Sequence, residues 1–106
     1  VKYFGEGSGS IALANAAALR GYQTWGYFYP DDATDGSLEA NQEHWSVLGM
    51  SWDAGLGAWL AVTSYGKKVI AHICSSEEQV VEAAGKGAHW FQCSNVRDIP
   101  AGRYEP

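Results

Sequence analysis

SGSIALANAAALRGYQTWGYFYP, residues 8–30, changes from a helical to an extended pattern at one glycine, and this change decides the fold. Its first half is rich in alanine, the residue with the highest helix propensity, and starts with serines that can accept a hydrogen bond from the first turn. Gly21 stands where a left-handed residue commonly ends a helix. The pattern predicts a helix over about 9–20. The aromatic run at 23–30 closes with a proline, which predicts a strand.

A second helix is predicted over about 76–86. The S-x-x-E spacing of Ser75 and Glu78 is typical of a capping box, and a glycine follows the last turn. The β-rich run at 68–74 precedes this helix, and a closing strand at 89–94 follows it.

The middle of the chain is predicted to be extended. Residues 31–42 show no period and are interpreted as a long surface loop, and 43–52 as a strand with a bulge at Gly49, where the alternation shifts by one residue. The run at 58–65 is a further predicted strand, joined to the one at 68–74 by a tight hairpin at Gly66.

The whole chain, residues 1–106, is therefore predicted to be one secreted α/β (α+β) domain. A short strand at 1–5 completes the order β-α-β-β-β-β-α-β, with two helices packed on a single five- or six-stranded mixed sheet. The 106 residues fit one core.

Charge excludes two classes of partner. Seven Lys and Arg against twelve Asp and Glu give a net charge of −5, so the chain lacks the positive charge that nucleic acids or anionic membranes attract. No apolar stretch reaches the roughly 18 residues of a membrane span. We expect neither nucleic-acid binding nor membrane insertion.

The two cysteines, Cys74 and Cys93, predict one disulfide and hence secretion. They end a strand and follow the next helix, which brings them into one neighbourhood. The first ten residues show no signal-peptide pattern, so we expect any leader to have been removed. Two buried free thiols in a cytosolic protein are the alternative.

Aromatic content is the strongest functional signal, with five Trp, six Tyr and three Phe. Ring faces stack on the C–H side of sugars while carboxylates accept from sugar hydroxyls. Two segments combine these types, so the predicted ligand-binding residues are Tyr27, Tyr29, Asp31, Asp32, His44 and Trp45, with Glu43 beside the last two. The alternative is that helices cover both faces of the sheet and bury the rings.

No catalytic or metal motif is found. The acidic residues Asp31, Asp32, Asp35 and Glu39 lack the spacing of a calcium loop and are interpreted as a solvated turn, with a cation site as the alternative. The three histidines are scattered, and His72 lies among apolar strand residues as a sheet histidine would. We therefore expect no enzyme, metal or cofactor.

From the serine-capped helix to the Cys74–Cys93 crossover, the layout resembles the small secreted mushroom lectins of the Y3 type. That resemblance implies an extracellular fungal protein that binds N-glycans bearing GalNAc and fucose. It also implies dimerisation by sheet extension and no catalytic residues. No site residue is carried over, because no position matches a family motif.

Three functions stay open at this point. The first is a secreted lectin that recognises glycans or glycoproteins, and the second a secreted toxin or inhibitor that contacts proteins through the same rings. The third is a small hydrolase or nuclease with Glu43 and either His44 or His89 as acid and base. A homodimer is predicted through a sheet edge, with 43–52 and 89–94 as the candidate edges because neither carries Lys or Pro.

Overall fold

Five parallel strands form the sheet of the computed structural model, which describes residues 2–4, 8–94 and 97. The strands lie side by side in chain order: β1 (Lys2–Phe4), β2 (Trp25–Tyr27), β3 (Val47–Ser51), β4 (Lys68–Cys74) and β5 (Trp90–Cys93). Every neighbouring pair is parallel. The α/β class is confirmed, but the predicted mixed sheet is wrong.

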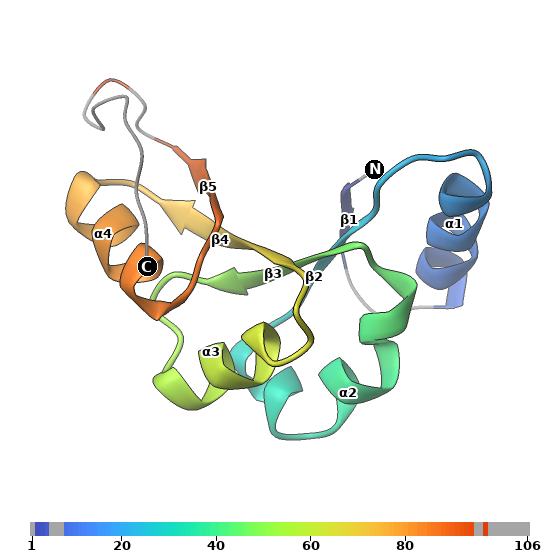
Figure 1. The fold of residues 1–106 in the computed structure, drawn as a ribbon, viewed down its shortest axis with the longest axis horizontal. Helices are drawn as coiled ribbons and strands as arrows, with labels where there is room; N and C mark the ends of the chain where they lie inside the picture. Colours follow the sequence, from blue (N-terminus) through green and yellow to red (C-terminus); the bar gives the residue numbers. More distant parts are fainter. Residues whose placement is uncertain (1, 5–7, 95–96, 98–106) are drawn as a thin grey trace.

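Helical segments make every connection between these strands. They are α1 (Ser8–Leu19), η1 (Pro30–Ala33), α2 (Ser37–Asn41), η2 (Gln42–His44), α3 (Leu56–Thr63) and α4 (Glu77–Lys86). Figure 1 shows α2 and α3 below the strands, with α1 and α4 at the two ends. Because chain order equals spatial order, right-handed crossovers place the connections on one face of the sheet.

One apolar core lies between the strands and these helices. Leu48 and Met50 of β3 alternate with residues of the opposite face, and their partners Val69 and Ala71 on β4 are equally buried. The helices add the rest of the core, chiefly Ala14, Leu38, Trp59, Val62, Val80 and Ala83. Most of the hydrophobic stabilisation therefore comes from this layer.

Two glycines allow indole rings to lie directly against the sheet. A Cβ on Gly26 would lie 2.7 Å from Cδ2 of Trp45, and a Cβ on Gly49 would overlap Nε1 of Trp25. Gly26 pairs with Leu48, so Trp45 occupies the core face, whereas Gly49 pairs with Tyr27 on the opposite face. The predicted bulge at Gly49 is wrong: its lack of a side chain makes room for a ring.

The predicted hairpin is also wrong, because residues 56–63 form α3 and not a strand. Ala58, Trp59 and Val62 are buried on one side of this helix, which is a helical spacing hidden in an apolar, β-branched segment. The segment is too short for periodicity alone to separate the two structures. Gly66 has a φ of 71° and turns the chain from α3 into β4.

The segment predicted as a surface loop holds three short helical turns. Leu38 of α2 is buried in the core, and η2 ends at His44, so β3 starts only at Val47. Asp35 accepts a hydrogen bond from the N–H of Ser37 at 2.9 Å, and this bond holds the pKa of the Asp35 carboxyl below its usual value. The acidic residues thus start turns, as short polar side chains commonly do.

Both helices predicted from caps are confirmed. Gly21 and Gly87 end α1 and α4 with φ of 84° and 114°, where a side chain would be strained. The capping residue of α4 is Ser76, whose side chain accepts from the N–H of Gln79, and not the predicted Ser75.

The two cysteines are direct register partners on β4 and β5. The predicted neighbourhood is confirmed, and both side chains are free thiols in this structure. Burial, with a smaller contribution from Cys93, raises the pKa of Cys74 to about 11, and burial also raises the pKa of Cys93. The disulfide stays a prediction.

Only one of the two segments predicted to form the dimer interface contains an edge strand of the sheet. The segment 43–52 contains β3, which pairs with β2 and β4 and is central, so that half of the prediction is wrong. β5 is an edge strand, and its Trp90 is exposed. Homodimerisation through β5 stays a prediction.

Replacing Gly26 with Ala is expected to destabilise the fold by roughly 1–3 kcal/mol, because the new methyl group overlaps the Trp45 ring. The control is Gly57→Ala in α3, where a Cβ meets nothing within 4 Å and a gain of up to about 1 kcal/mol is expected. Urea unfolding followed by tryptophan fluorescence measures both. Equal stability of the two variants would contradict the close approach at Gly26.

In the reduced native protein, iodoacetamide is expected to alkylate Cys93 before Cys74. Cys74 is fully buried, and its raised pKa leaves almost no thiolate at neutral pH, whereas Cys93 is half-buried. Peptide mass spectrometry over a time course measures the order. If the two residues form a disulfide, protein unfolded without reductant takes no label, and labelling of both thiols there rules the bond out.

Candidate functional site

A stack of three rings marks the carboxyl end of β2. The Tyr27 ring lies flat on the imidazole of His72, with centroids 3.5 Å apart and planes at 21°. Tyr29 meets the same Tyr27 ring edge to face, at 5.3 Å and 71°. His72 is only 1% exposed and Tyr29 is 62% exposed, so the stack runs from the protein interior to its surface. The sheet position predicted for His72 is confirmed.

Carboxylates surround this stack. Asp32 in η1 accepts a hydrogen bond from the N–H of Tyr29 at 2.7 Å. Asp53 follows β3 and accepts from the hydroxyl of Ser51, the register partner of His72. Burial raises the pKa of Tyr27, and the neighbouring Tyr29 and Asp53 raise it further, so the phenol stays protonated at neutral pH. We call Tyr27, Tyr29, Asp32 and Asp53 the tyrosine platform.

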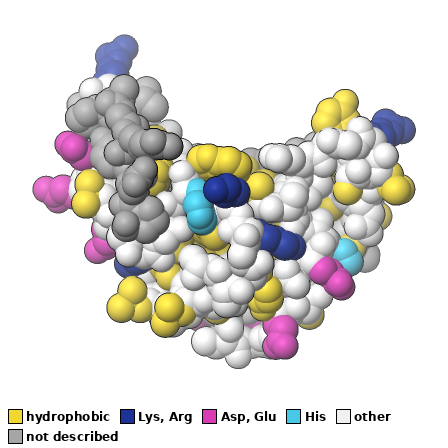
Figure 2. Space-filling model, viewed as in Figure 1, with side chains coloured by type: hydrophobic (Ala, Val, Ile, Leu, Met, Phe, Trp, Pro, Cys, Tyr) yellow, Lys and Arg dark blue, Asp and Glu magenta, His cyan; other side chains and the backbone are white. Residues whose placement is uncertain are grey.

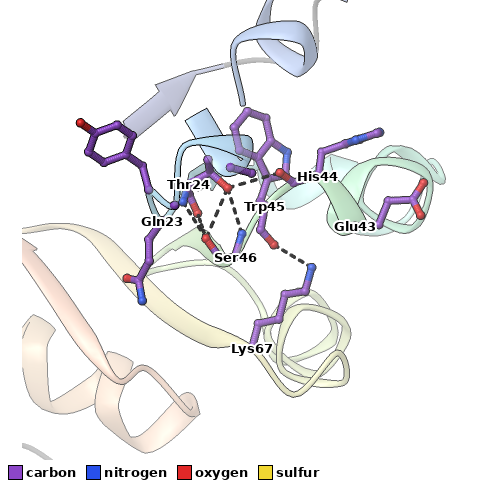
Figure 3. A pocket seen from close by; sticks show the side chains of 10 residues that line it. Gln23, Thr24, Glu43, His44, Trp45, Ser46 and Lys67 are labelled. Carbon is purple, nitrogen blue, oxygen red and sulfur yellow. Dashed lines mark hydrogen bonds between the residues drawn. The ribbon is translucent and has the colours of Figure 1, made fainter. Parts of the chain in front are cut away.

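A pocket of about 460 Å³ lies at the opposite, amino end of the strands. Figure 3 shows its polar centre, where Thr24 and Ser46 bind each other. The N–H of Thr24 donates to Oγ of Ser46 at 2.6 Å, the N–H of Ser46 donates to Oγ1 of Thr24 at 3.1 Å, and Oγ of Ser46 donates to the Thr24 carbonyl at 3.0 Å. We call this cavity the amino-end pocket; its other lining residues are Ala18, Gly21, Tyr22, Gln23, Glu43, His44, Trp45 and Lys67.

Trp45 is a core residue that also borders the amino-end pocket, and its predicted ligand binding stays a prediction. It is 3% exposed and belongs to the main apolar cluster, because Gly26 leaves space for its ring against the sheet. Glu43 and His44 precede it on η2 and do line the pocket.

The predicted site residues therefore fall into two separate groups. Tyr27 and Tyr29 lie together with Asp31 and Asp32 where β2 ends, whereas residues 43–45 precede β3 at the other end of the sheet. Parallel strands place residues that follow them at one edge and residues that precede them at the opposite edge. The tyrosine platform and the amino-end pocket are therefore two separate candidate sites.

Sequence reasoning missed Asp53, Tyr22 and Lys67. Asp53 follows β3 at the same edge where Tyr29 follows β2, and a parallel sheet would have predicted that neighbourhood. The hairpin predicted between 58–65 and 68–74 implied antiparallel strands, so the predicted sheet did not place Asp53 beside Tyr29. Lys67 carried a weak signal, as a charged residue between a turn glycine and a strand.

His89 is unsuited to the acid–base role considered for it. Its Nδ1 accepts a hydrogen bond from the N–H of Val69 at 3.1 Å, and burial together with Lys68 lowers its pKa. Glu43 shares the amino-end pocket with His44 and not with His89.

Within residues 2–4, 8–94 and 97, no three His, Cys, Asp or Glu side chains are grouped so that they could hold a metal ion. None of the helices in this described part of the chain has the length and apolar character to cross a membrane. No family model, curated protein or solved structure matches the chain.

Trp45→Ala is expected to cost roughly 3–5 kcal/mol of unfolding free energy, because it leaves a large cavity between η2 and the sheet. Trp90→Ala on the edge strand is the control and should cost much less, since that ring is exposed. Thermal unfolding measures both. A Trp45→Ala variant as stable as the control would return Trp45 to the surface candidates.

Proposed function

We propose that the chain is a secreted glycan-binding domain of the lectin kind, and that its sugar site is the tyrosine platform. One observation carries the proposal: the exposed Tyr29 ring is held edge to face by Tyr27, which is itself stacked on buried His72. A ring fixed in this way loses little side-chain entropy when a sugar stacks on it.

Hydrogen-bonding groups beside the rings support the same function. Asp31 and Asp53 are exposed carboxylates near Tyr29 and Tyr27, and sugar hydroxyls donate to such groups with charge-assisted bonds. The protonated Tyr27 phenol adds a donor. The Asp32 carboxylate already accepts a hydrogen bond from the Tyr29 N–H. Its role here is therefore to stabilise the turn that keeps the Tyr29 ring exposed.

The position of the tyrosine platform at the carboxyl ends of the strands also supports a ligand site. Ligands of open parallel sheets bind beyond the carboxyl ends of the strands, and the tyrosine platform lies there. The strand order has no reversal and therefore no switch-point crevice, so we expect a shallow site and weak binding of single sugars. A homodimer through β5 would compensate by presenting two sites to one glycan.

Two alternative functions are each supported by an observation of their own. A toxin or inhibitor that contacts a protein would use the same exposed Tyr29 as an anchor. A hydrolase would use the amino-end pocket, where Glu43 and His44 lie side by side. Turnover assays on polysaccharide and RNA test the second alternative directly.

A glycan array on the wild-type protein, followed by binding measurements on Tyr29→Ala, tests the proposal. We expect bound glycans, a loss of roughly tenfold or more in affinity on truncation, and a change in stability within about 0.5 kcal/mol because the ring is exposed.

Tyr22→Ala is a matched control, because Tyr22 is also 62% exposed but lines the amino-end pocket. It should leave the affinity for uncharged glycans unchanged. Failure of the wild type to bind any glycan would remove the lectin proposal and favour protein contact. Equal losses in the two variants would move the sugar site away from the tyrosine platform.

A further inference from the structure

The amino-end pocket contains a lysine, Lys67, that forms no ion pair with any carboxylate of the described residues. Nζ of Lys67 donates to the carbonyl oxygens of Gln42 and Trp45, at 2.5 and 2.7 Å. An ammonium group has three N–H donors, so one remains after these two bonds. Among the described residues, no carboxylate lies within the 4.0 Å of an ion pair with Lys67.

The surroundings of Lys67 increase the need for a negative charge. Its side chain is half-buried, and burial lowers the pKa of the ammonium because desolvation disfavours the charged form. Glu43 acts on it only from a distance, and Figure 3 shows the Glu43 side chain projecting away from Lys67.

The rest of the pocket can hold an organic body beside that charge. The hydroxyls of Thr24 and Ser46 are engaged with each other and with backbone groups, so they form a fixed floor. Apolar wall surface comes from Ala18 and Tyr22, and His44 adds an imidazole. The volume of about 460 Å³ exceeds what an isolated carboxylate fills.

We propose that the amino-end pocket binds a ring-sized organic carboxylate, with the anion on the remaining N–H of Lys67 and the ring against Tyr22. A single negative charge matches a single ammonium. Lys67 is the one Lys or Arg among the described lining residues, so a phosphate dianion would bring a second charge that no such group balances, in a protein of net charge −5. The carboxylate can belong to an aromatic acid or to an acidic sugar, since both offer the same anion on a ring.

The probes are benzoate, glucuronate and inorganic phosphate, titrated into isotope-labelled protein while the amide signals of Thr24 and Ser46 are followed by NMR. Saturable shifts with benzoate or glucuronate support the proposal. The probe with the higher affinity shows whether the ring is that of an aromatic acid or of an acidic sugar. No saturable shift with either, or tighter binding of phosphate, overturns it.

Variants separate ligand binding from the structural role of Lys67. Lys67→Met should weaken binding by about tenfold or more, as expected when a charged hydrogen bond is lost. Lys68→Met makes the same change in net charge one residue away, outside the pocket lining, and should change affinity less than twofold. An equal loss in both variants would indicate non-specific charge attraction and contradict the site.

Lys67→Met also removes two hydrogen bonds to η2 and its cap, so it can fail to fold. Tyr22→Ala then provides the test, because this exposed ring is not part of the core and its loss should still weaken benzoate binding. Unchanged benzoate affinity in Tyr22→Ala would overturn the proposed pose. The proposal stands apart from the lectin function, since Tyr29→Ala and the uncharged glycans of the array report on the other end of the sheet.

Discussion

The close packing of tryptophan rings onto two glycines of a parallel sheet is the constraint on which the rest of this structure depends. Gly26 and Gly49 lie on neighbouring strands and accept Trp45 and Trp25 on opposite faces. Trp45 joins η2 to the core, and Trp25 lies beside the face that carries His72 and Tyr27. The Trp45 contact thus fixes the helical connection before β3 against the sheet, and Trp25 shares its face with the ring stack that supports Tyr29.

Parallel pairing then gives the two ends of the sheet, where the strands begin and where they end, different sets of side chains. Residues that follow β2 and β3 supply an exposed tyrosine and carboxylates, whereas residues that precede β2, β3 and β4 supply the amino-end pocket with Lys67. Figure 2 shows that the described surface is hollowed along its upper side, with hydrophobic side chains on the floor of the hollow and basic side chains and a histidine beside it. The two proposed sites differ in charge as well as in place, because exposed Asp31 and Asp53 lie at one and Lys67 lines the other.

Lysines also support the fold by donating to backbone carbonyls of turns and loops. Lys86 donates to the carbonyls of Trp52 and Ala54, both at 2.9 Å, and so holds the loop between β3 and α3 from the side of α4. Glu82 lies 3.5 Å from the same ammonium, which balances its charge. Lys67 binds η2 in the same manner, but no carboxylate of the described residues lies within 4.0 Å of it, and this difference distinguishes a structural lysine from a candidate anion site.

The sequence by itself determined the α/β class, the two capped helices, and the neighbourhood of Cys74 and Cys93. These features depend on local physics, namely helix propensity, capping side chains, left-handed glycines and the alternation of a strand. Tertiary structure decided that residues 56–63 form a helix, that Trp45 is core, and that Asp53 meets Tyr27. A short apolar segment fits the periodicity of a helix as well as that of a strand. An aromatic ring is buried or exposed according to which element packs against it. Only the parallel register and the glycines at 26 and 49 settle these questions, because both act between residues far apart in the chain.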